Sequence, residues 1–201
     1  MITDKIKKFY SNLHFPGRYS WEDLKFYEEQ GIHNIYLREI NSVMRDGISI
    51  LDVGCGEGTY PNLFKNNGLF ADSKIFGIEA WTPYISTYNL EEKYYKIFNE
   101  DVRNFDWNQV ENLDLVIFGD VLEHMSKDES QQLVNTALSK TKYIIISIPI
   151  KHMPQDAVGG NPFEIHVKDN WTHQEVLASF TNIIKFGTTK KIGVYWIEGQ
   201  K

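Results

Sequence analysis

The segment at 48–58, ISILDVGCGEG, constrains the fold of this chain more than any other. A short apolar run ends at Asp52, and three glycines then follow at alternate positions, Gly54, Gly56 and Gly58. Because glycine has no Cβ, a turn of this composition lets backbone approach a ligand closely. The pattern predicts a buried strand that stops at Asp52 and turns sharply into the start of a helix.

Size and charge narrow the function classes. The chain has 201 residues, a net charge of −6 and no cluster of basic residues, which argues against nucleic acid as a partner. It contains no apolar run of about 18 residues and no apolar signal-peptide core near Met1, so we expect neither a membrane span nor a leader. The single cysteine, Cys55, cannot form an internal disulfide, which fits the cytoplasm. Its place in the glycine turn suits a small residue packed beneath a ligand better than a nucleophile.

The order of elements predicts one domain over residues 1–201. Residues 1–45 form an expected N-terminal helical cap, with Ser20 as the N-cap of a helix over 21–30 and apolar residues at helical spacing from Ile32 to Val43. Residues 46–201 alternate between apolar strands and amphipathic helices, as in a parallel sheet covered on both faces. The expected strands are Ile48–Val53, Lys74–Glu79, Tyr94–Asn99, Leu113–Gly119, Tyr143–Ile148, Ile183–Phe186 and Ile192–Ile197; the expected helices are Thr59–Asn66, Pro83–Tyr88, Lys127–Ser139 and one that begins at Thr172.

The last two strands depart from the alternation. Only five residues, 187–191, join them, which is too short for a crossover helix. They therefore pair antiparallel. The expected fold class is α/β, with a doubly wound, mostly parallel, seven-stranded sheet that ends in an antiparallel hairpin.

The glycine turn resembles motif I of the class I methyltransferases that depend on S-adenosylmethionine (SAM). That family has a Rossmann-like sheet with helices on both faces and an antiparallel C-terminal hairpin, whereas NAD-binding domains usually lack the hairpin. The glycine spacing at Gly54, Gly56 and Gly58 also differs from the dinucleotide pattern G-x-G-x-x-G. The resemblance implies SAM as cofactor and S-adenosylhomocysteine (SAH) as product.

Acids after successive strands complete the expected cofactor site. Asp52 suits a ligand with a positive amine and sulfonium, and Glu79 can accept both ribose hydroxyls. The resemblance implies that Asp101 holds the adenine amine while Val102 packs on the ring. Any one of these acids could be an ordinary solvated residue at a strand end, but three in order favour a SAM site. The expected cofactor-binding residues are Asp52, Gly54, Cys55, Gly56, Gly58, Glu79, Ala80, Trp81, Asp101, Val102 and Gly119.

A second group of polar residues follows the fourth strand, in Gly119–Met125. If a helix begins there, Asp120, Glu123 and His124 share one face of one turn, and with His166 they could hold Mg²⁺ or Mn²⁺. The alternative is a structural or acid–base role, because Leu-Glu-His after this strand is widespread in class I methyltransferases. These four residues are the expected catalytic and metal-binding set.

The metal hypothesis gains from a narrower resemblance over residues 48–175. Metal-dependent O-methyltransferases of small-RNA 3′ ends carry Glu-x-x-Glu-His after the fourth strand and a later His shortly before an aromatic residue. Ubiquinone-pathway O-methyltransferases look similar at the first element. Here Asp120 replaces the first Glu, and Trp171 follows His166 one residue later than in the RNA enzymes. The rivals of His166 are His152, Asp156 and Glu164.

These observations predict a SAM-dependent O-methyltransferase that acts on a vicinal diol with help from a divalent metal. The acidic chain and the missing RNA-binding extension favour a small molecule, and the loop at 159–166 loosely resembles one in glycan-modifying methyltransferases, so a sugar or glycan is the preferred acceptor. Two alternatives stay open. One is a metal-free methyltransferase of a catechol, nitrogen or carbon acceptor that uses His124 as base. The other is a non-catalytic SAM-binding module, such as one domain of a larger polypeptide.

Overall fold

The computed structural model describes residues 32–44 and 47–201. The expected helix over 21–30 and its Ser20 cap lie outside these residues. Helix α3 (Ile32–Met44) confirms a helix at the end of the N-terminal segment. Its Tyr36 and Ile40 are buried as their spacing predicts, but Val43 is 64% exposed, and Met44 packs against the core instead.

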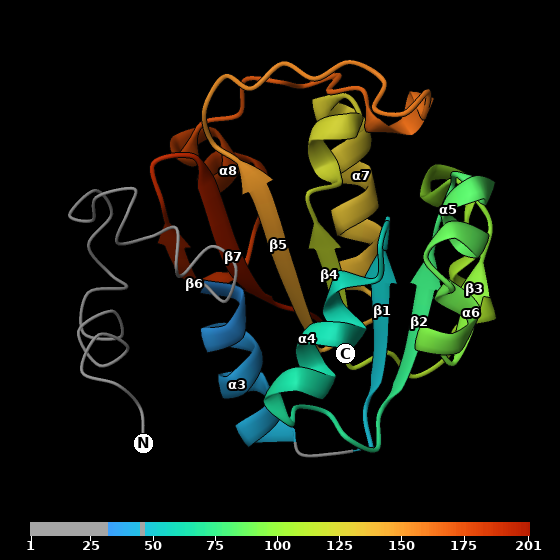
Figure 1. The fold of residues 1–201 in the computed structure, drawn as a ribbon. Helices are drawn as coiled ribbons and strands as arrows, with labels where there is room; N and C mark the ends of the chain where they lie inside the picture. The colour runs from blue at the N-terminus through green and yellow to red at the C-terminus, as the bar shows by residue number, and fades with distance from the viewer. Residues whose placement is uncertain (1–31, 45–46) are drawn as a thin grey trace.

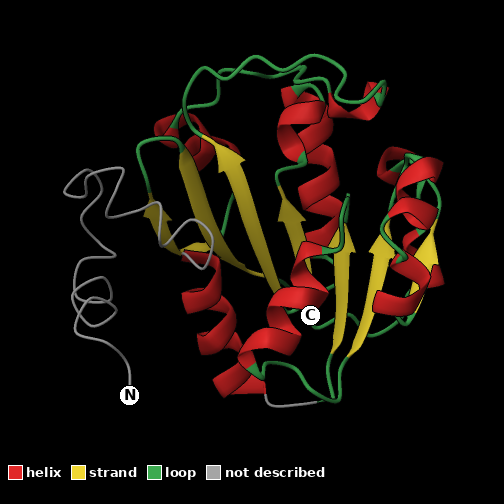
Figure 2. Cartoon of the chain, viewed as in Figure 1, coloured by secondary structure: helices red, strands yellow, loops and turns green. Residues whose placement is uncertain are grey.

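A seven-stranded sheet forms the centre of the molecule (Figures 1 and 2). Its spatial order is β3-β2-β1-β4-β5-β7-β6, with the first five strands parallel and β7 antiparallel to both β5 and β6. The predicted fold class and C-terminal hairpin are therefore confirmed. The strands are β1 (Ser49–Val53), β2 (Lys74–Ile78), β3 (Lys96–Phe98), β4 (Leu115–Gly119), β5 (Tyr143–Pro149), β6 (Ile183–Thr188) and β7 (Ile192–Glu198).

Four of the helices are those expected from the sequence, and their ends differ from the expectation by at most one residue. The short helix α6 and the brief 3₁₀ turns were not anticipated. The helices after α3 are α4 (Thr59–Asn67), α5 (Thr82–Thr87), α6 (Leu90–Lys93), α7 (Lys127–Leu138) and α8 (His173–Ser179).

Successive side chains along a strand point into two different buried layers, one on each face of the sheet. The central strands are therefore continuous apolar runs in the sequence. On β4, Leu115 and Ile117 pack in one layer with residues of α3 and α4. Val116 and Phe118 point the other way, into a layer with residues of α7 and α8. Both faces of the sheet are thus covered, and its strand ends are left as the edge open to ligands.

Two side chains fix where helices begin on the carboxyl side of the sheet. Ser126 and Glu129 form a capping box at the start of α7, in which each side chain bonds the other's backbone N–H. Thr172 caps α8 by accepting a hydrogen bond from the backbone N–H of Glu175, at the predicted position.

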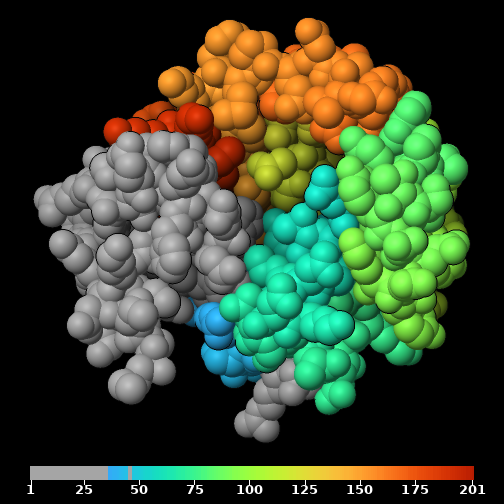
Figure 3. All heavy atoms as spheres, in the orientation of Figure 1, coloured from blue at the N-terminus to red at the C-terminus, as the bar shows by residue number. Residues whose placement is uncertain are grey.

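The strand order reverses between β1 and β4, because β2 and β3 lie on one side of β1 while β4 and β5 extend the other way. In such sheets the crevice at this switch point, outside the carboxyl ends of the strands, is where ligands bind. The segment after β5 crosses this edge, approaches α5 and returns to α8 (Figures 1 and 3); near α5, Glu164 accepts a hydrogen bond from Tyr84. None of the helices in the described ranges is long and apolar enough to span a bilayer.

Candidate functional site

The glycine turn after β1 adopts the conformation that its sequence predicts. Gly54, Gly56 and Gly58 all have left-handed φ angles, of 61°, 48° and 74°. At Gly54 the need for glycine is also steric, since an added Cβ would lie 2.7 Å from a methyl group of Val121. The turn thus packs directly against the segment that follows β4.

Glu79 links the glycine turn after β1 to the turn after β2. Its side chain is buried, and its two oxygens accept hydrogen bonds from the backbone N–H groups of Gly56 (2.9 Å) and Trp81 (2.7 Å). Burial raises the pKa of the Glu79 carboxyl, although these two hydrogen bonds oppose the shift. The acid that ends β2 therefore holds the glycine turn in place as well as facing the crevice.

Asp52 lies beneath the glycine turn. It is 1% exposed, and Tyr94 donates a hydrogen bond of 2.5 Å to its carboxylate. Burial raises the pKa of Asp52 to about 7, in spite of the hydrogen bond from Tyr94. Cys55 packs beside it against Leu90 and Tyr94, as a small residue under the turn, and burial raises the pKa of its thiol. Asp52 thus contributes to the support of the turn rather than to the cavity wall.

A cavity of about 110 Å³ opens at the switch point, where several expected site residues meet. It brings together residues after β1, β2, β3 and β4, and the segment after β5 supplies the remaining wall. The expected residues in its lining are Gly54, Gly56, Glu79, Asp101, Val102, Asp120 and His124. The expected residues outside its lining are Asp52, Cys55, Gly58, Ala80, Trp81, Gly119, Glu123 and His166.

Apart from the rival Glu164, the expected site does not include five residues of this lining, Arg103, Val121, Met125, Asn161 and Phe163. Val121 and Met125 lie inside the segment 119–125 that was already of interest, so their apolar character was an available signal. Arg103 comes two residues after Asp101, and its bonds to that carboxylate could have been anticipated from the opposite charges.

The segment after β4 corrects one expectation. Asp120 has a left-handed φ of 54°, and only Leu122–His124 is helical, as a single 3₁₀ turn (η3). The predicted α-helical turn with Asp120, Glu123 and His124 on one face is therefore wrong. Asp120 is exposed, and its carboxylate accepts a hydrogen bond from the Ser147 hydroxyl at 3.2 Å.

Glu123, His124 and His166 nevertheless come together. One potential ligand atom from each lies within 4.8 Å of the other two, and the histidine rings are 4.9 Å apart in an edge-to-face arrangement. Asp120 is not a member of this group. The sequence therefore identified three residues that do converge, together with a fourth that does not.

Both histidines turn the same nitrogen toward backbone. Nδ1 of His124 lies 3.2 Å from the carbonyl oxygen of Ile165, and Nδ1 of His166 lies 2.5 Å from that of Met153. A carbonyl oxygen can only accept, so Nδ1 carries the proton in each neutral ring and Nε2 keeps its lone pair. Metal-binding histidines are oriented by the same kind of contact.

Glu123 is the least satisfied polar residue of the group. It is 1% exposed, and its Oε2 atom is buried with no hydrogen-bond partner. Burial raises the pKa of its carboxyl well above the ordinary value, and the nearby charge of Asp120 adds to the shift. Burial also lowers the pKa of His124, so its imidazole is neutral near pH 7.

The residues that could replace His166 as a ligand lie in different surroundings. The side chain of His152 is 68% exposed beside Asp169, and Asp156 is exposed. Glu164 lines the cavity, where Gln155 donates to its carboxylate at 3.2 Å. Trp171, the aromatic residue that follows His166, is 1% exposed within the core.

Comparison with known proteins identifies a domain within the chain and a shared fold. Residues 51–141 match the family model described as a methyltransferase domain. No curated protein sequence matches the chain. A large set of solved structures shares its fold.

Three of these structures illustrate the likeness. Magnesium protoporphyrin IX methyltransferase from Synechocystis PCC 6803, with bound SAM, is 14% identical with a TM-score of 0.60, over 96% of this chain and 91% of that one. The N-terminal domain of EvdMO1, in the presence of SAH and D-fucose, is 13% identical with a TM-score of 0.58, over 99% and 98% of the two chains. The plantazolicin methyltransferase BpumL, in complex with SAH, is 12% identical with a TM-score of 0.63, over 98% and 91%.

At this level of identity the likeness to solved structures shows a shared fold alone. The structure brings the glycine turn and the acids that follow β2 and β3 to the cavity at the switch point, where the sequence analysis expects a SAM site. Residues 51–141 thus match a methyltransferase domain, and the chain has the Rossmann-like fold of the methyltransferases compared above.

Proposed function

We propose that the protein is an O-methyltransferase that acts on a hydroxyl of a vicinal diol, with a divalent cation held by Glu123, His124 and His166. The observation that carries the proposal is the Oε2 atom of Glu123, which is buried without a partner. An unpaired buried carboxylate is costly unless a cation or a donor satisfies it. The two histidines beside it offer nitrogen lone pairs rather than donors, so a cation fits this group.

The ligand types favour one of the two metals expected from the sequence. A carboxylate oxygen and two imidazole nitrogens suit Mn²⁺ better than Mg²⁺, which prefers oxygen ligands. When bound, such an ion lowers the pKa of a coordinated hydroxyl, as it does for water. The backbone contacts of the two histidines already fix their rings for this role.

The chain's own residues bind the cofactor and place it. In this proposal Glu79 accepts the ribose hydroxyls, and Asp101 with Val102 holds adenine. The cavity that they line extends to Asp120 and His124, so the methyl donor lies beside the cation site. Efficient transfer needs the acceptor oxygen about 3–3.5 Å from the methyl carbon.

Entry of the cofactor requires movement of one wall. The cavity of about 110 Å³ is smaller than the roughly 300–1,000 Å³ of typical ligand sites. Four of its walls come from segments that follow strands of the sheet, whereas Phe163 and Glu164 belong to the crossing segment and are partly exposed. We therefore infer that residues 161–164 move outward to admit SAM.

The preferred acceptor is a sugar or glycan hydroxyl. Acidic groups at the rim, Asp120 and Glu164, can accept hydrogen bonds from several hydroxyls, and they disfavour an anionic acceptor such as a phosphate. Phe163 is 36% exposed at the same rim and offers an apolar face for a sugar ring. The structure of the EvdMO1 domain determined with D-fucose is consistent with this class.

Methyl transfer from labelled SAM to a panel of sugars, catechols and RNA ends tests the proposal. Activity should disappear in EDTA and return with Mn²⁺ or Mg²⁺. Glu123→Ala should abolish transfer while SAH binding persists, and His152→Ala, outside the group, should leave transfer unchanged. Full activity in EDTA would remove the metal from the proposal.

One observation favours a second candidate. His124 lines the cavity and its pKa is lowered by burial, so it is a neutral base near pH 7. A metal-free methyltransferase could use it to accept the proton of a catechol or amine. EDTA-resistant transfer that is lost in His124→Ala would support this candidate.

A further inference from the structure

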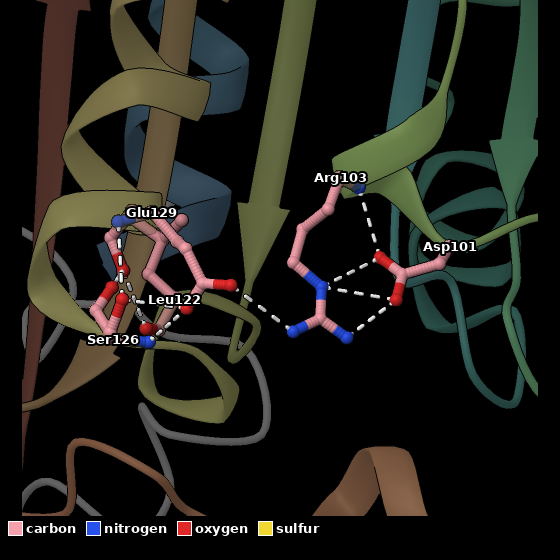
Figure 4. Close-up of polar contacts among 6 residues, drawn as sticks. Asp101, Arg103, Leu122, Ser126 and Glu129 are labelled. Atoms are coloured by element: carbon pink, nitrogen blue, oxygen red, sulfur yellow. Dashed lines mark hydrogen bonds and ion pairs between the residues drawn. The ribbon is translucent and has the colours of Figure 1, made fainter.

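Arg103 makes several contacts with Asp101, the N-cap of the 3₁₀ turn after β3. Its backbone N–H donates to Oδ1 of Asp101 at 2.9 Å, its Nε lies 3.0 Å from both carboxylate oxygens, and its Nη2 donates to Oδ2 at 2.5 Å (Figure 4). A carboxylate has about four acceptor sites. Three donors from one residue therefore leave about one site of Asp101 for a ligand.

The same guanidinium reaches a second segment. Its Nη1 lies 3.3 Å from Oε1 of Glu129, the residue that forms the capping box with Ser126 at the start of α7 (Figure 4). Ser130, one residue further, donates from its hydroxyl to the carbonyl of Leu122 at 2.9 Å. The contacts thus run from the end of β3 to η3.

Both ends of this connection line the same cavity. Asp101, Val102 and Arg103 form one part of its wall, and Val121, His124 and Met125 form another. Arg103, in the first part of the wall, pairs with Glu129 in α7, the helix that follows the second part. A lysine could not do the same, because its single ammonium lacks the planar fork that serves two carboxylates at once.

We propose that Arg103 is a positioning residue for the cofactor: it fixes the carboxylate of Asp101 so that its remaining acceptor site receives the 6-amino group of adenine. The proposal rests on the proposed role of Asp101 and is independent of the metal. The hydrogen bonds from Arg103 outweigh the effect of burial and lower the pKa of Asp101, so the group is an acceptor throughout the neutral range.

A purely structural role fits the contacts less well. The side chains of Arg103 and Glu129 are each 41% exposed, and ion pairs with this exposure stabilise folded proteins little. Loss of Arg103 should therefore leave the melting temperature almost unchanged. Its effect should appear in ligand recognition, and specifically in recognition of the adenine amine.

Calorimetric titration with two ligands tests this. The first is SAH, and the second is the SAH analogue whose adenine 6-amino group is replaced by oxygen, which presents an acceptor where Asp101 expects a donor. Wild-type protein should prefer SAH. Arg103→Ala and Arg103→Lys should weaken SAH binding about tenfold and change the affinity for the analogue less than threefold, so that selectivity falls.

Glu129→Gln is the matched variant, because glutamine keeps the capping box while it loses the charge that pairs with Arg103. It should weaken SAH binding about threefold in the wild type and have no effect in the Arg103→Ala background. Unchanged or tighter SAH binding in Arg103→Ala overturns the proposal, as does an equal loss for both ligands. A wild-type protein that does not bind SAH at all would instead refute the cofactor site itself.

Discussion

Replacing Asp52 by asparagine should stabilise the protein at alkaline pH. Asp52 is 1% exposed, and burial raises its pKa to about 7 from an ordinary 3.8. The folded protein therefore keeps the carboxyl protonated at pH values where the unfolded chain has released the proton. Asparagine has nearly the same shape, and its carbonyl can still accept the hydrogen bond from Tyr94.

The sign and size follow from this shift. A raised folded-state pKa contributes stability that is complete below pH 3.8 and is lost as pH rises through 7. The shift is about 3 units, since 7 − 3.8 is 3.2, which corresponds to about 4 kcal/mol at 1.36 kcal/mol per unit. Roughly one unit is already lost at pH 5, so the change between pH 5 and pH 8 is about 3 kcal/mol.

Urea unfolding of the wild type and of Asp52→Asn at pH 5, 6, 7 and 8 measures this change. Groups common to both proteins cancel in the difference between their free energies of unfolding. The difference should shift in favour of the variant by about 3 kcal/mol over this range. Asp72→Asn, at an exposed turn, corrects for the loss of one formal charge. A difference that does not vary with pH, or that favours the variant more at pH 5, would refute the reasoning.

Three further substitutions test other parts of the account. Gly54→Ala should destabilise the fold by about 1–3 kcal/mol and abolish SAH binding, because φ is 61° there and the new Cβ meets Val121; unchanged calorimetric affinity would contradict the described turn. Ser126→Ala removes the capping box of α7 and should cost about 0.5–2 kcal/mol in urea unfolding, and a neutral result would mean that the cap does not stabilise this helix. His166→Ala should weaken Mn²⁺ binding at least tenfold while His152→Ala leaves it unchanged. The reverse result would mean that His152, and not His166, binds the ion together with Glu123 and His124.

The fold could be read from the sequence because each part of it has a local cause. The apolar runs that became β1, β4 and β5 are buried on both faces, so their hydrophobicity is continuous and easy to recognise. The five-residue link before the last strand left only an antiparallel pairing. The third strand was predicted as Tyr94–Asn99 but covers only Lys96–Phe98, since Tyr94 is the C-cap of the unanticipated helix α6.

The site was predictable where it depends on strand order and less so where it depends on a single backbone angle. Glu79 and Asp101 reached the cavity because parallel strands bring their carboxyl ends to one edge. Asp120 left the expected group because its left-handed φ interrupts the helix that its spacing suggested. Arg103 was missed, and the contact of Asp52 with Tyr94 was not foreseen, because the partners Glu129 and Tyr94 come from distant segments that no local pattern connects.

Titration of Mn²⁺ into the SAH-bound protein tests the central claim most directly, because it needs no knowledge of the acceptor. The account predicts one ion per chain, with affinity reduced at least tenfold in Glu123→Gln and SAH affinity unchanged in that variant. Absence of Mn²⁺ binding, or binding that Glu123→Gln leaves intact, would contradict it.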